Sequence, residues 1–327
     1  MKKLPLKIIA AMISSIALFA TSVSAANRTV NCNEGQSIQD AVEKGRGSAA
    51  ELYIDVSGSC EEVVTIKRDD VTIDGGETAT VIGSILVEGG RRISINEITI
   101  TGGGVGIEGG DLKLTNVVIT ENSVGVLAVE SSHVSIFDST IENNRLAGIV
   151  ADVGSNVFVR YTSISEHDEF GIILYSNSTA KVGRSKVNGN NIGISVRDSS
   201  SLSVGNTDIA NNSSTGIETD NGATVVVHNN STISSNAGGG IDADLHSSVR
   251  ISNSTITNNG NYGIKLQSDS GVRINPNVIV SGNGFAGEFC DNAESCGVFC
   301  GDIESSVLDL SDIADEVECT DFNQLEP

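Results

Sequence analysis

The sequence predicts an all-β solenoid, a coil of short strands stacked in parallel, on three observations. First, a Gly–aliphatic step recurs eight times at intervals of 19, 23, 23, 22, 23, 24 and 23 residues, and such a fixed period is typical of stacked repeats. Second, the apolar residues alternate in short runs, as in strands, and no ten-residue stretch has a helical period. Third, several repeats carry Asn four residues before the repeat glycine. The eight steps are Gly106–Ile107, Gly125–Val126, Gly148–Ile149, Gly171–Ile172, Gly193–Ile194, Gly216–Ile217, Gly240–Ile241 and Gly263–Ile264.

The stretch from Ser248 to Lys265 shows the spacing within one repeat. Val249 and Ile251 alternate with polar residues, Ile256 follows five residues later, and Gly263–Ile264 closes the unit. We expect about three short strands in each repeat, with every buried aliphatic stacked about 4.8 Å above its counterpart. Eight Phe, four Tyr and no Trp suit a narrow aliphatic core, and three Pro suit central parallel strands.

The Asn positions predict a second ladder at a turn. Stacked Asn side chains can hydrogen-bond from layer to layer and tolerate a left-handed backbone, and the adjacent repeat glycine is expected to adopt a conformation that other residues resist. Counting four residues back from the repeat glycine places His167 in this slot in one layer and Gly189 in another. The Asn members of the row are Asn144, Asn212, Asn236, Asn259 and, before Gly287, Asn283.

These markers, over roughly residues 64–287, resemble the right-handed parallel β-helix family, the pectin-lyase-like proteins. The resemblance implies a single-stranded right-handed parallel β-helix of about nine to ten rungs. The alternative is a leucine-rich repeat, which would need Leu at most inward positions and a helical segment in each repeat. In the β-helix family, substrate clefts commonly run along one outer sheet, and its lyases pair acidic calcium ligands with a nearby Lys or Arg base.

The first 25 residues are predicted to be a signal peptide. Lys2 and Lys3 precede an apolar run, residues 8–20, that is too short to span a bilayer, and Ala25 ends a small-residue cleavage site. We therefore expect an exported protein, periplasmic or extracellular, with no membrane insertion after the signal is removed. The mature chain divides into an N-terminal cap with a short helix at 36–43 and first strands (26–63), the β-helix (64–288) and a Cys-rich C-terminal cap (289–327).

All six cysteines lie outside the repeats. An even number in an exported chain favours disulfides, and Cys32–Cys60 is the expected N-terminal bridge. The remaining four can pair in three ways, and a zinc site is the alternative use for them. These four are Cys290, Cys296, Cys300 and Cys319.

The chain is strongly acidic, with 42 acidic and 20 basic side chains and a net charge of -22. Removal of the signal peptide takes away three lysines and brings the net charge to -25. Nucleic acid is therefore not expected as a partner, because its phosphates require Lys and Arg. Acidic polymers would also be repelled unless a cation bridges them, and the charge by itself keeps a long rod soluble.

The candidate site is a surface strip formed by the residues two and four positions after each repeat glycine. Its acidic part is predicted to hold Ca²⁺, which favours several oxygen ligands, or to have raised pKa values that suit acid/base catalysis, or to be a solvated acidic face. The candidate metal ligands are Glu218, Asp220, Asp242 and Asp244. The candidate catalytic residues are Arg197, Asp220, Asp244 and Lys265, and the candidate substrate-binding residues are Asp152, Tyr175 and Arg197.

Three functions remain open on this sequence. The strip could bind a polysaccharide or other extended glycan; it could serve a calcium-assisted polysaccharide lyase, hydrolase or epimerase; or the rod could be a non-catalytic envelope or adhesion structure. In a lyase, Arg197 or Lys265 would take the proton beside a uronate carboxylate. Glu166-His167-Asp168 resembles the His-Asp part of the alginate epimerase motif without its leading Asp-Pro, so a turn histidine is the favoured interpretation. Fold analogy favours glycan binding.

Overall fold

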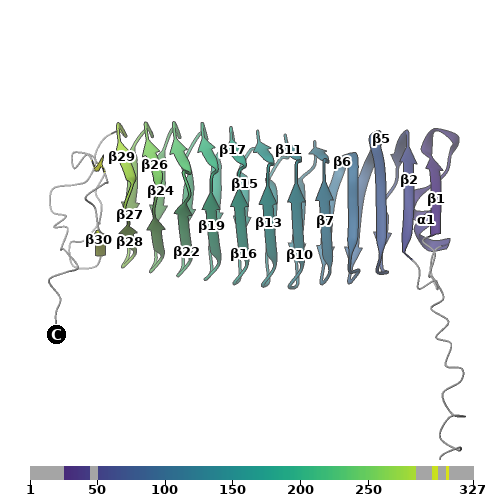
Figure 1. Cartoon of the computed structure of the whole chain (residues 1–327), viewed down its shortest axis with the longest axis horizontal. Coiled ribbons are helices and arrows are strands. Elements are labelled where there is room, and N and C mark those ends of the chain that lie inside the picture. The colour runs from purple at the N-terminus through teal and green to yellow at the C-terminus, as the bar shows by residue number, and fades with distance from the viewer. Residues whose placement is uncertain (1–25, 45–50, 285–296, 301–306, 309–327) are drawn as a thin grey trace, which may run out of the picture.

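The computed structural model describes residues 26–44 and 51–284, together with the backbone of residues 297–300 and 307–308. These residues form a right-handed parallel β-helix of about eleven turns, which Figure 1 shows side-on as a straight rod. The predicted all-β solenoid is confirmed. The predicted leucine-rich alternative is wrong, because the described repeats contain strands and no helix. The predicted signal peptide, residues 1–25, lies outside the described residues.

The N-terminal segment, residues 26–63, contains the first strands of the stack. Strand β1 pairs in parallel with β2, and β2 with β5, so the first turns already lie within the predicted cap. Strands β5 and β6 are long because each bends through all three sides of one turn. The elements are β1 (Ala26–Asn31), η1 (Cys32–Glu34), α1 (Ile38–Lys44), β2 (Leu52–Ser57), β3 (Ser59–Glu61), β4 (Val64–Ile66), β5 (Val71–Glu88) and β6 (Ile93–Glu108).

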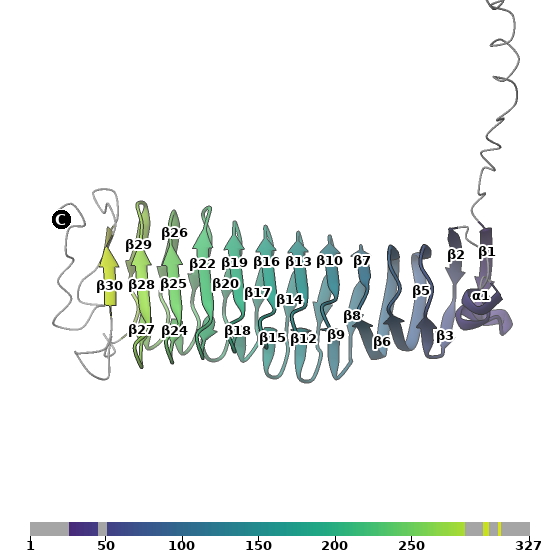
Figure 2. The same cartoon turned by 90° about the horizontal axis from the view of Figure 1, so that it is seen from below.

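From residue 111 each turn consists of three separate short strands, and equivalent strands pair in parallel to give three faces (Figure 2). The first face holds β7 (Asp111–Thr115), β10 (His133–Phe137), β13 (Asn156–Arg160), β16 (Thr179–Gly183), β19 (Ser201–Gly205), β22 (Thr224–His228), β25 (Ser248–Ile251), β28 (Gly271–Ile274) and β30 (Gly297–Cys300). The second holds β8 (Val118–Thr120), β11 (Thr140–Glu142), β14 (Ser163–Ser165), β17 (Lys186–Asn188), β20 (Asp208–Ala210), β23 (Thr232–Ser234), β26 (Ser254–Thr257), β29 (Val278–Ser281) and β31 (Val307–Leu308). The third holds β9 (Val124–Val129), β12 (Ala147–Ala151), β15 (Phe170–Leu174), β18 (Ile192–Val196), β21 (Ile217–Thr219), β24 (Gly239–Ala243) and β27 (Tyr262–Leu266).

The core is a set of aliphatic columns. Ile172, Ile194 and Ile217 are direct partners in successive layers, and all three are fully buried. Burying each such side chain stabilises the fold by about 1.5–3 kcal/mol, and the fixed register places the neighbouring residues on the outside of the rod.

The predicted Asn ladder is present, with one correction. Asn190, and not Gly189, occupies the slot between His167 and Asn212, and it is 1% exposed. The interval from Gly171 to Gly193 is one residue short of the usual 23, so a count of four from the glycine ends one position too early. Gly189 precedes the ladder and has φ 71. The full ladder is Asn122, Asn144, His167, Asn190, Asn212, Asn236, Asn259 and Asn283.

The repeat glycines are required by space and not, as predicted, by an unusual backbone conformation. None of the eight has a positive φ. A Cβ on Gly193 would lie 2.5 Å from the carbonyl oxygen of Gly216 and 2.9 Å from the side-chain Nδ2 of Asn212. Stacked backbones and the Asn ladder therefore leave no room for a side chain at this position.

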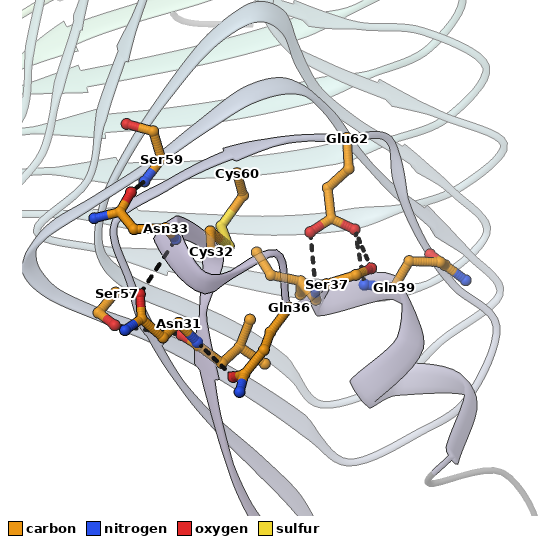
Figure 3. The surroundings of a disulfide bond; sticks show 12 residues. Asn31, Cys32, Asn33, Gln36, Ser37, Gln39, Ser57, Ser59, Cys60 and Glu62 are labelled. Atoms are coloured by element: carbon orange, nitrogen blue, oxygen red, sulfur yellow. Dashed lines mark hydrogen bonds between the residues drawn. A yellow bond between two sulfur atoms is a disulfide. The ribbon is translucent and has the colours of Figure 1, made fainter.

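The N-terminal cap is fixed to the first turns by a disulfide and a half-buried carboxylate (Figure 3). The predicted Cys32–Cys60 bridge is confirmed, with a Cα–Cα distance of 5.1 Å. Glu62 accepts hydrogen bonds from the Ile38 and Gln39 backbone N–H groups at 2.7 and 3.0 Å, and from the Ser37 hydroxyl at 2.7 Å. Because a carboxylate at a helix N-terminus satisfies free N–H groups, Glu62 anchors α1 to the solenoid.

At the other end, β30 and β31 pair in parallel with β28 and β29, so stacking continues past the predicted boundary at residue 288. The C-terminal disulfides or zinc site predicted from Cys290, Cys296, Cys300 and Cys319 fall outside the side chains that the structure describes. Within the described residues, no helix is long and apolar enough to cross a bilayer.

Candidate functional site

One line of outward-directed positions runs along the third face through nine successive layers. We call it the central row. At about 4.8 Å per layer it is roughly 40 Å long. From Leu127 onward its residues follow the order that the sequence predicts, whereas Gly106, counted in the sequence as a repeat glycine, is in register with Leu127 and not with Gly125. Its members are Leu86, Gly106, Leu127, Val150, Ile173, Ser195, Glu218, Asp242 and Lys265.

The N-terminal part of the central row is apolar and slightly hollow. Gly106 has no side chain between Leu86 and Leu127, and a shallow depression of about 170 Å³ lies there. Leu127 is 39% exposed. This end of the row can therefore contact the apolar side of a ligand.

The middle of the row is covered, which corrects the expectation of a continuous exposed strip. Ile173 and Ser195 point outward in register but are 2% and 0% exposed. The Arg197 Nε donates to the Ser195 hydroxyl at 3.0 Å, and the guanidinium lies 5.7 Å from the Phe170 ring centre. Arg197 thus lies across the face, over Ser195 and beside Phe170.

The C-terminal part of the row holds two shielded ion pairs. Arg197 Nη2 lies 3.5 Å from Glu218 Oε2, with side chains 34% and 30% exposed. Lys265 Nζ lies 3.8 Å from Asp242 Oδ2, with side chains 27% and 23% exposed. By comparison, the side chains of the Lys67–Glu88 pair are 55% and 43% exposed. Partial burial strengthens the fields of the row's charges relative to ordinary surface pairs.

Burial also changes the protonation of this region. The pKa of Glu218 is raised, chiefly by burial and further by Asp242 and Asp220, while Arg197 opposes the shift. Asp220 Oδ1 is buried and makes no hydrogen bond within the described residues. A hydroxyl or amide of a ligand could therefore form a hydrogen bond with Glu218 and with the unpaired Oδ1 of Asp220.

Tyr262 belongs to the same cluster, although sequence reasoning did not include it. Its hydroxyl donates to Asp242 Oδ2 in the preceding layer at 2.8 Å, and Lys265 Nζ lies 5.9 Å from its ring centre. Burial raises its pKa, as does the charge of Asp242. The ring needs Gly239 beside it, because a Cβ there would collide with the ring. In the sequence, the run Gly238-Gly239-Gly240 could have indicated that space is left for a large side chain of the next layer.

Two of the predicted site residues make hydrogen bonds within turns. The side chain of Asp152 accepts a hydrogen bond from the Val153 N–H at 2.7 Å, and Asp244 accepts one from the Leu245 N–H at 2.7 Å. Tyr175 lies half-buried at the equivalent turn position of the layer between Asp152 and Arg197. The structure therefore assigns a local structural contact to both aspartates, whereas the candidate Lys265 pairs with Asp242.

The four candidate calcium ligands are not gathered around one point. In the part of the chain that the structure describes, no three of these carboxylates have oxygens within 4.8 Å of one another. Glu218 and Asp242 are direct partners in adjacent layers, but each is paired with a cation. Calcium binding stays a prediction.

The family model of the right handed beta helix region matches residues 54–192 and 170–300. The chain belongs to this family. No curated protein sequence matches the chain significantly. Among solved structures, the Azotobacter vinelandii mannuronan C-5 epimerase AlgE6 A-module is similar, with 16% identity, a TM-score of 0.60, and coverage of 85% of this chain and 96% of that one. Pectate lyase Pel9A is also similar, with 13% identity, a TM-score of 0.44, and coverage of 90% and 80%.

In this β-helix protein, His167 is a structural residue, as the turn interpretation predicts. It is 2% exposed and takes the place of an Asn in the ladder, accepting the Asn144 N–H at Nδ1 at 3.1 Å. Burial lowers its pKa to about 4. Its neighbours Glu166 and Asp168 are exposed, so the three residues do not form one site.

Proposed function

We propose that this chain is an exported β-helix protein that binds an extended carbohydrate polymer along the central row. The observation that carries the proposal is the register of the shielded pairs Arg197–Glu218 and Asp242–Lys265 over adjacent layers. Such a row offers two acidic acceptors, flanked by two cationic donors, to sugar hydroxyls. Phe170, Tyr175 and Tyr262 add ring surface beside it, and aromatic rings pack well against apolar groups.

Two further facts support this function. One structure of the same fold is a mannuronan C-5 epimerase, a polysaccharide-acting protein by its name. The Cys32–Cys60 disulfide suits an oxidising compartment outside the cytoplasm, in agreement with the predicted signal peptide and a periplasmic or extracellular location.

The binding test is a titration of the full-length mature protein with a panel of neutral and acidic polysaccharides, with Ca²⁺ and with chelator. Tyr175→Ala/Arg197→Gln should weaken binding by at least about tenfold, because a charge-assisted hydrogen bond contributes about 1.5–3 kcal/mol. Arg250→Gln removes an exposed arginine from the first face and should leave the affinity unchanged. Equal affinity of the double variant and the wild type would contradict the proposal, and failure of every polymer to bind would favour a structural rod.

A second candidate is a polysaccharide lyase, hydrolase or epimerase, favoured by the raised pKa of Glu218 beside Arg197. In that case Glu218 is a better proton carrier than the predicted Asp244, whose side chain is engaged in its turn. Incubation with pectate, alginate and chondroitin plus Ca²⁺ tests this function. Unsaturated product, new reducing ends or epimerised uronate, lost in Glu218→Gln, would establish an enzyme; unchanged polymer would exclude it for those substrates.

A further inference from the structure

The N-terminal disulfide lies beside the carboxylate of Glu62. The sulfur atoms of Cys32 and Cys60 and a carboxylate oxygen of Glu62 all lie within 4.8 Å of one another, and Figure 3 shows the three side chains together at the N-terminal cap. Among the described residues, this is the one group of three or more His, Cys, Asp or Glu side chains whose ligand atoms are so close. The disulfide holds these sulfurs in the oxidised chain, and reduction frees both of them as ligands.

The freed groups are of the types that zinc prefers. Zn²⁺ binds thiolate sulfur at about 2.3 Å and carboxylate oxygen at about 2.0–2.2 Å in a tetrahedral arrangement, so neighbouring ligand atoms lie about 3.5–3.8 Å apart. The Cα atoms of Cys32 and Cys60 are 5.1 Å apart, and rotation of the two side chains is enough to reach this separation. Two thiolates also select against Ca²⁺ and Mg²⁺, which prefer oxygen ligands.

The position of Cys32 does not depend on the disulfide. Asn31 ends the ladder between β1 and β2, and its side chain accepts the Asn33 N–H at 3.2 Å. The Asn33 side chain in turn accepts the Ser59 N–H at 3.3 Å, next to Cys60 in β3. The two cysteines therefore stay close after the bond between them is broken, and ligands that are already in place lower the entropy cost of binding.

The Glu62 carboxylate is oriented by the segment that it caps. It accepts the three hydrogen bonds from Ser37, Ile38 and Gln39 described above. An ionised carboxylate has about four acceptor sites, so one site remains for a metal. Carboxylates that bind metals are themselves oriented by hydrogen bonds of this kind. Glu62 can therefore bind an ion while α1 stays attached to the solenoid.

A reductant has access to one of the two sulfurs. Cys60 is 2% exposed, whereas Cys32 is partly exposed, so a dithiol attacks the Cys32 sulfur and the Cys60 thiolate leaves. The second thiol of the reductant then displaces Cys32 from the mixed disulfide. The reductant ends as a disulfide, and both cysteines take up protons. Zinc binding releases these two protons, because the ligand is the thiolate.

We propose that Cys32, Cys60 and Glu62 bind one Zn²⁺ when the disulfide is reduced, with water as the fourth ligand. The ion replaces the disulfide as the link between η1 and β3. Every chain is synthesised with its cysteines reduced, and a solenoid end whose strand edge is uncovered is prone to aggregation. Zinc keeps the cap on this end until oxidation. The site is separate from the central row and does not depend on the proposed function.

The first test counts zinc on the full-length mature protein, reduced without oxygen by a phosphine, which is a poor ligand for zinc. In competition with a chromophoric chelator, the reduced wild type should bind one more Zn²⁺ per chain than reduced Cys32→Ser/Cys60→Ser. Both proteins keep the four C-terminal cysteines, so zinc bound there cancels in the difference.

Glu62→Gln tests the carboxylate. It should weaken the binding of this ion by at least about tenfold, since the loss of even an outer-shell partner costs about 10–100-fold in metal affinity. Glu61→Gln is the matched control: it makes the same change of charge at the exposed neighbouring position and should leave the affinity within about twofold. The oxidised Glu62→Gln protein retains the disulfide, so its melting temperature reports whether the variant is folded.

Limited proteolysis then locates the ion. With free Zn²⁺ at about ten times its Kd, opening of the reduced cap should fall about tenfold, so cleavage within residues 26–63 should slow by that factor relative to chelator. Reduced Cys32→Ser/Cys60→Ser should gain no such protection. Three results would overturn the proposal: equal zinc counts in the wild type and the double cysteine variant, equal losses of affinity in Glu62→Gln and Glu61→Gln, or cleavage of the reduced cap that zinc does not slow.

Discussion

The guanidinium of Arg197 lies 3.5 Å from the carboxylate of Glu218 in the next layer, and about two thirds of each side chain is shielded from solvent. Even so, the pKa of Glu218 is raised, because burial outweighs the attraction of Arg197. Glu218 therefore takes up a proton more readily than an ordinary surface glutamate. A ligand that donates a hydrogen bond to Glu218 would offset the cost of burying its charge.

Replacement of Glu218 by Gln tests this balance. A carboxyl with a raised pKa favours the folded state when protonated, and this contribution is lost as the pH rises through the folded-state pKa. We therefore expect Glu218→Gln to be at least as stable as the wild type at neutral pH, with the difference shrinking as the pH falls toward 4.5. Denaturant unfolding at several pH values measures it. A variant that is less stable at neutral pH would show that the Arg197 ion pair dominates.

The buried His167 should make the protein acid-sensitive. Its pKa falls from 6.5 to about 4 on burial, so the unfolded chain takes up a proton between these values while the folded one does not. Stability is then present above pH 6.5 and declines by about 3 kcal/mol as the pH falls to about 4. His167→Asn, which restores the residue of the neighbouring layers, should flatten this part of the pH profile. An unchanged profile in the variant would assign the acid sensitivity to other groups.

The Asn ladder should respond strongly to a single truncation. Asn212 accepts hydrogen bonds from the backbone and side-chain N–H groups of Asn190, both at 3.1 Å, and donates to Asn236 at 2.8 Å. Asn212→Ala leaves several buried groups without partners, each costing about 1–3 kcal/mol, and we expect a loss of about 3 kcal/mol or more in the free energy of unfolding. Asn191→Ala, one residue outside the ladder and partly exposed, is the control and should cost less than about 1 kcal/mol.

The N-terminal disulfide should stabilise the cap. It closes a separation of 28 residues, and the chain-entropy model gives about 3.6 kcal/mol for a loop of this size. Cys32→Ser/Cys60→Ser should lower the free energy of unfolding by that order and increase proteolysis within residues 26–63. Ser59→Ala is the control beside the bridge. Wild-type stability in the double variant would mean that Glu62 and the packing of α1 hold the cap by themselves.

The repeat period in the sequence is enough to predict the architecture. A period near 23 residues places Ile172, Ile194 and Ile217 in one column, because each turn can bury its apolar side only against the equivalent residues of the next turn. The order of the central row follows from the same register. Counting along the chain failed where a turn changed length, as at Asn190 and Gly106, and it misjudged the exposure of Ile173 and Ser195.

Which side chains meet could be read only from the three-dimensional packing. Tyr262 reaches Asp242 across a layer because Gly239 leaves space for its ring. Asp152 and Asp244 instead bond to their own turns. Phe137 and Phe158 from adjacent repeats bring their rings within 5.6 Å, and the Arg184 guanidinium lies 5.6 Å from the Tyr161 ring centre of the preceding repeat. The repeat fixes where each backbone position lies, but the direction of a long side chain depends on the volume and charge of its neighbours one layer away, some 20 residues distant in the sequence.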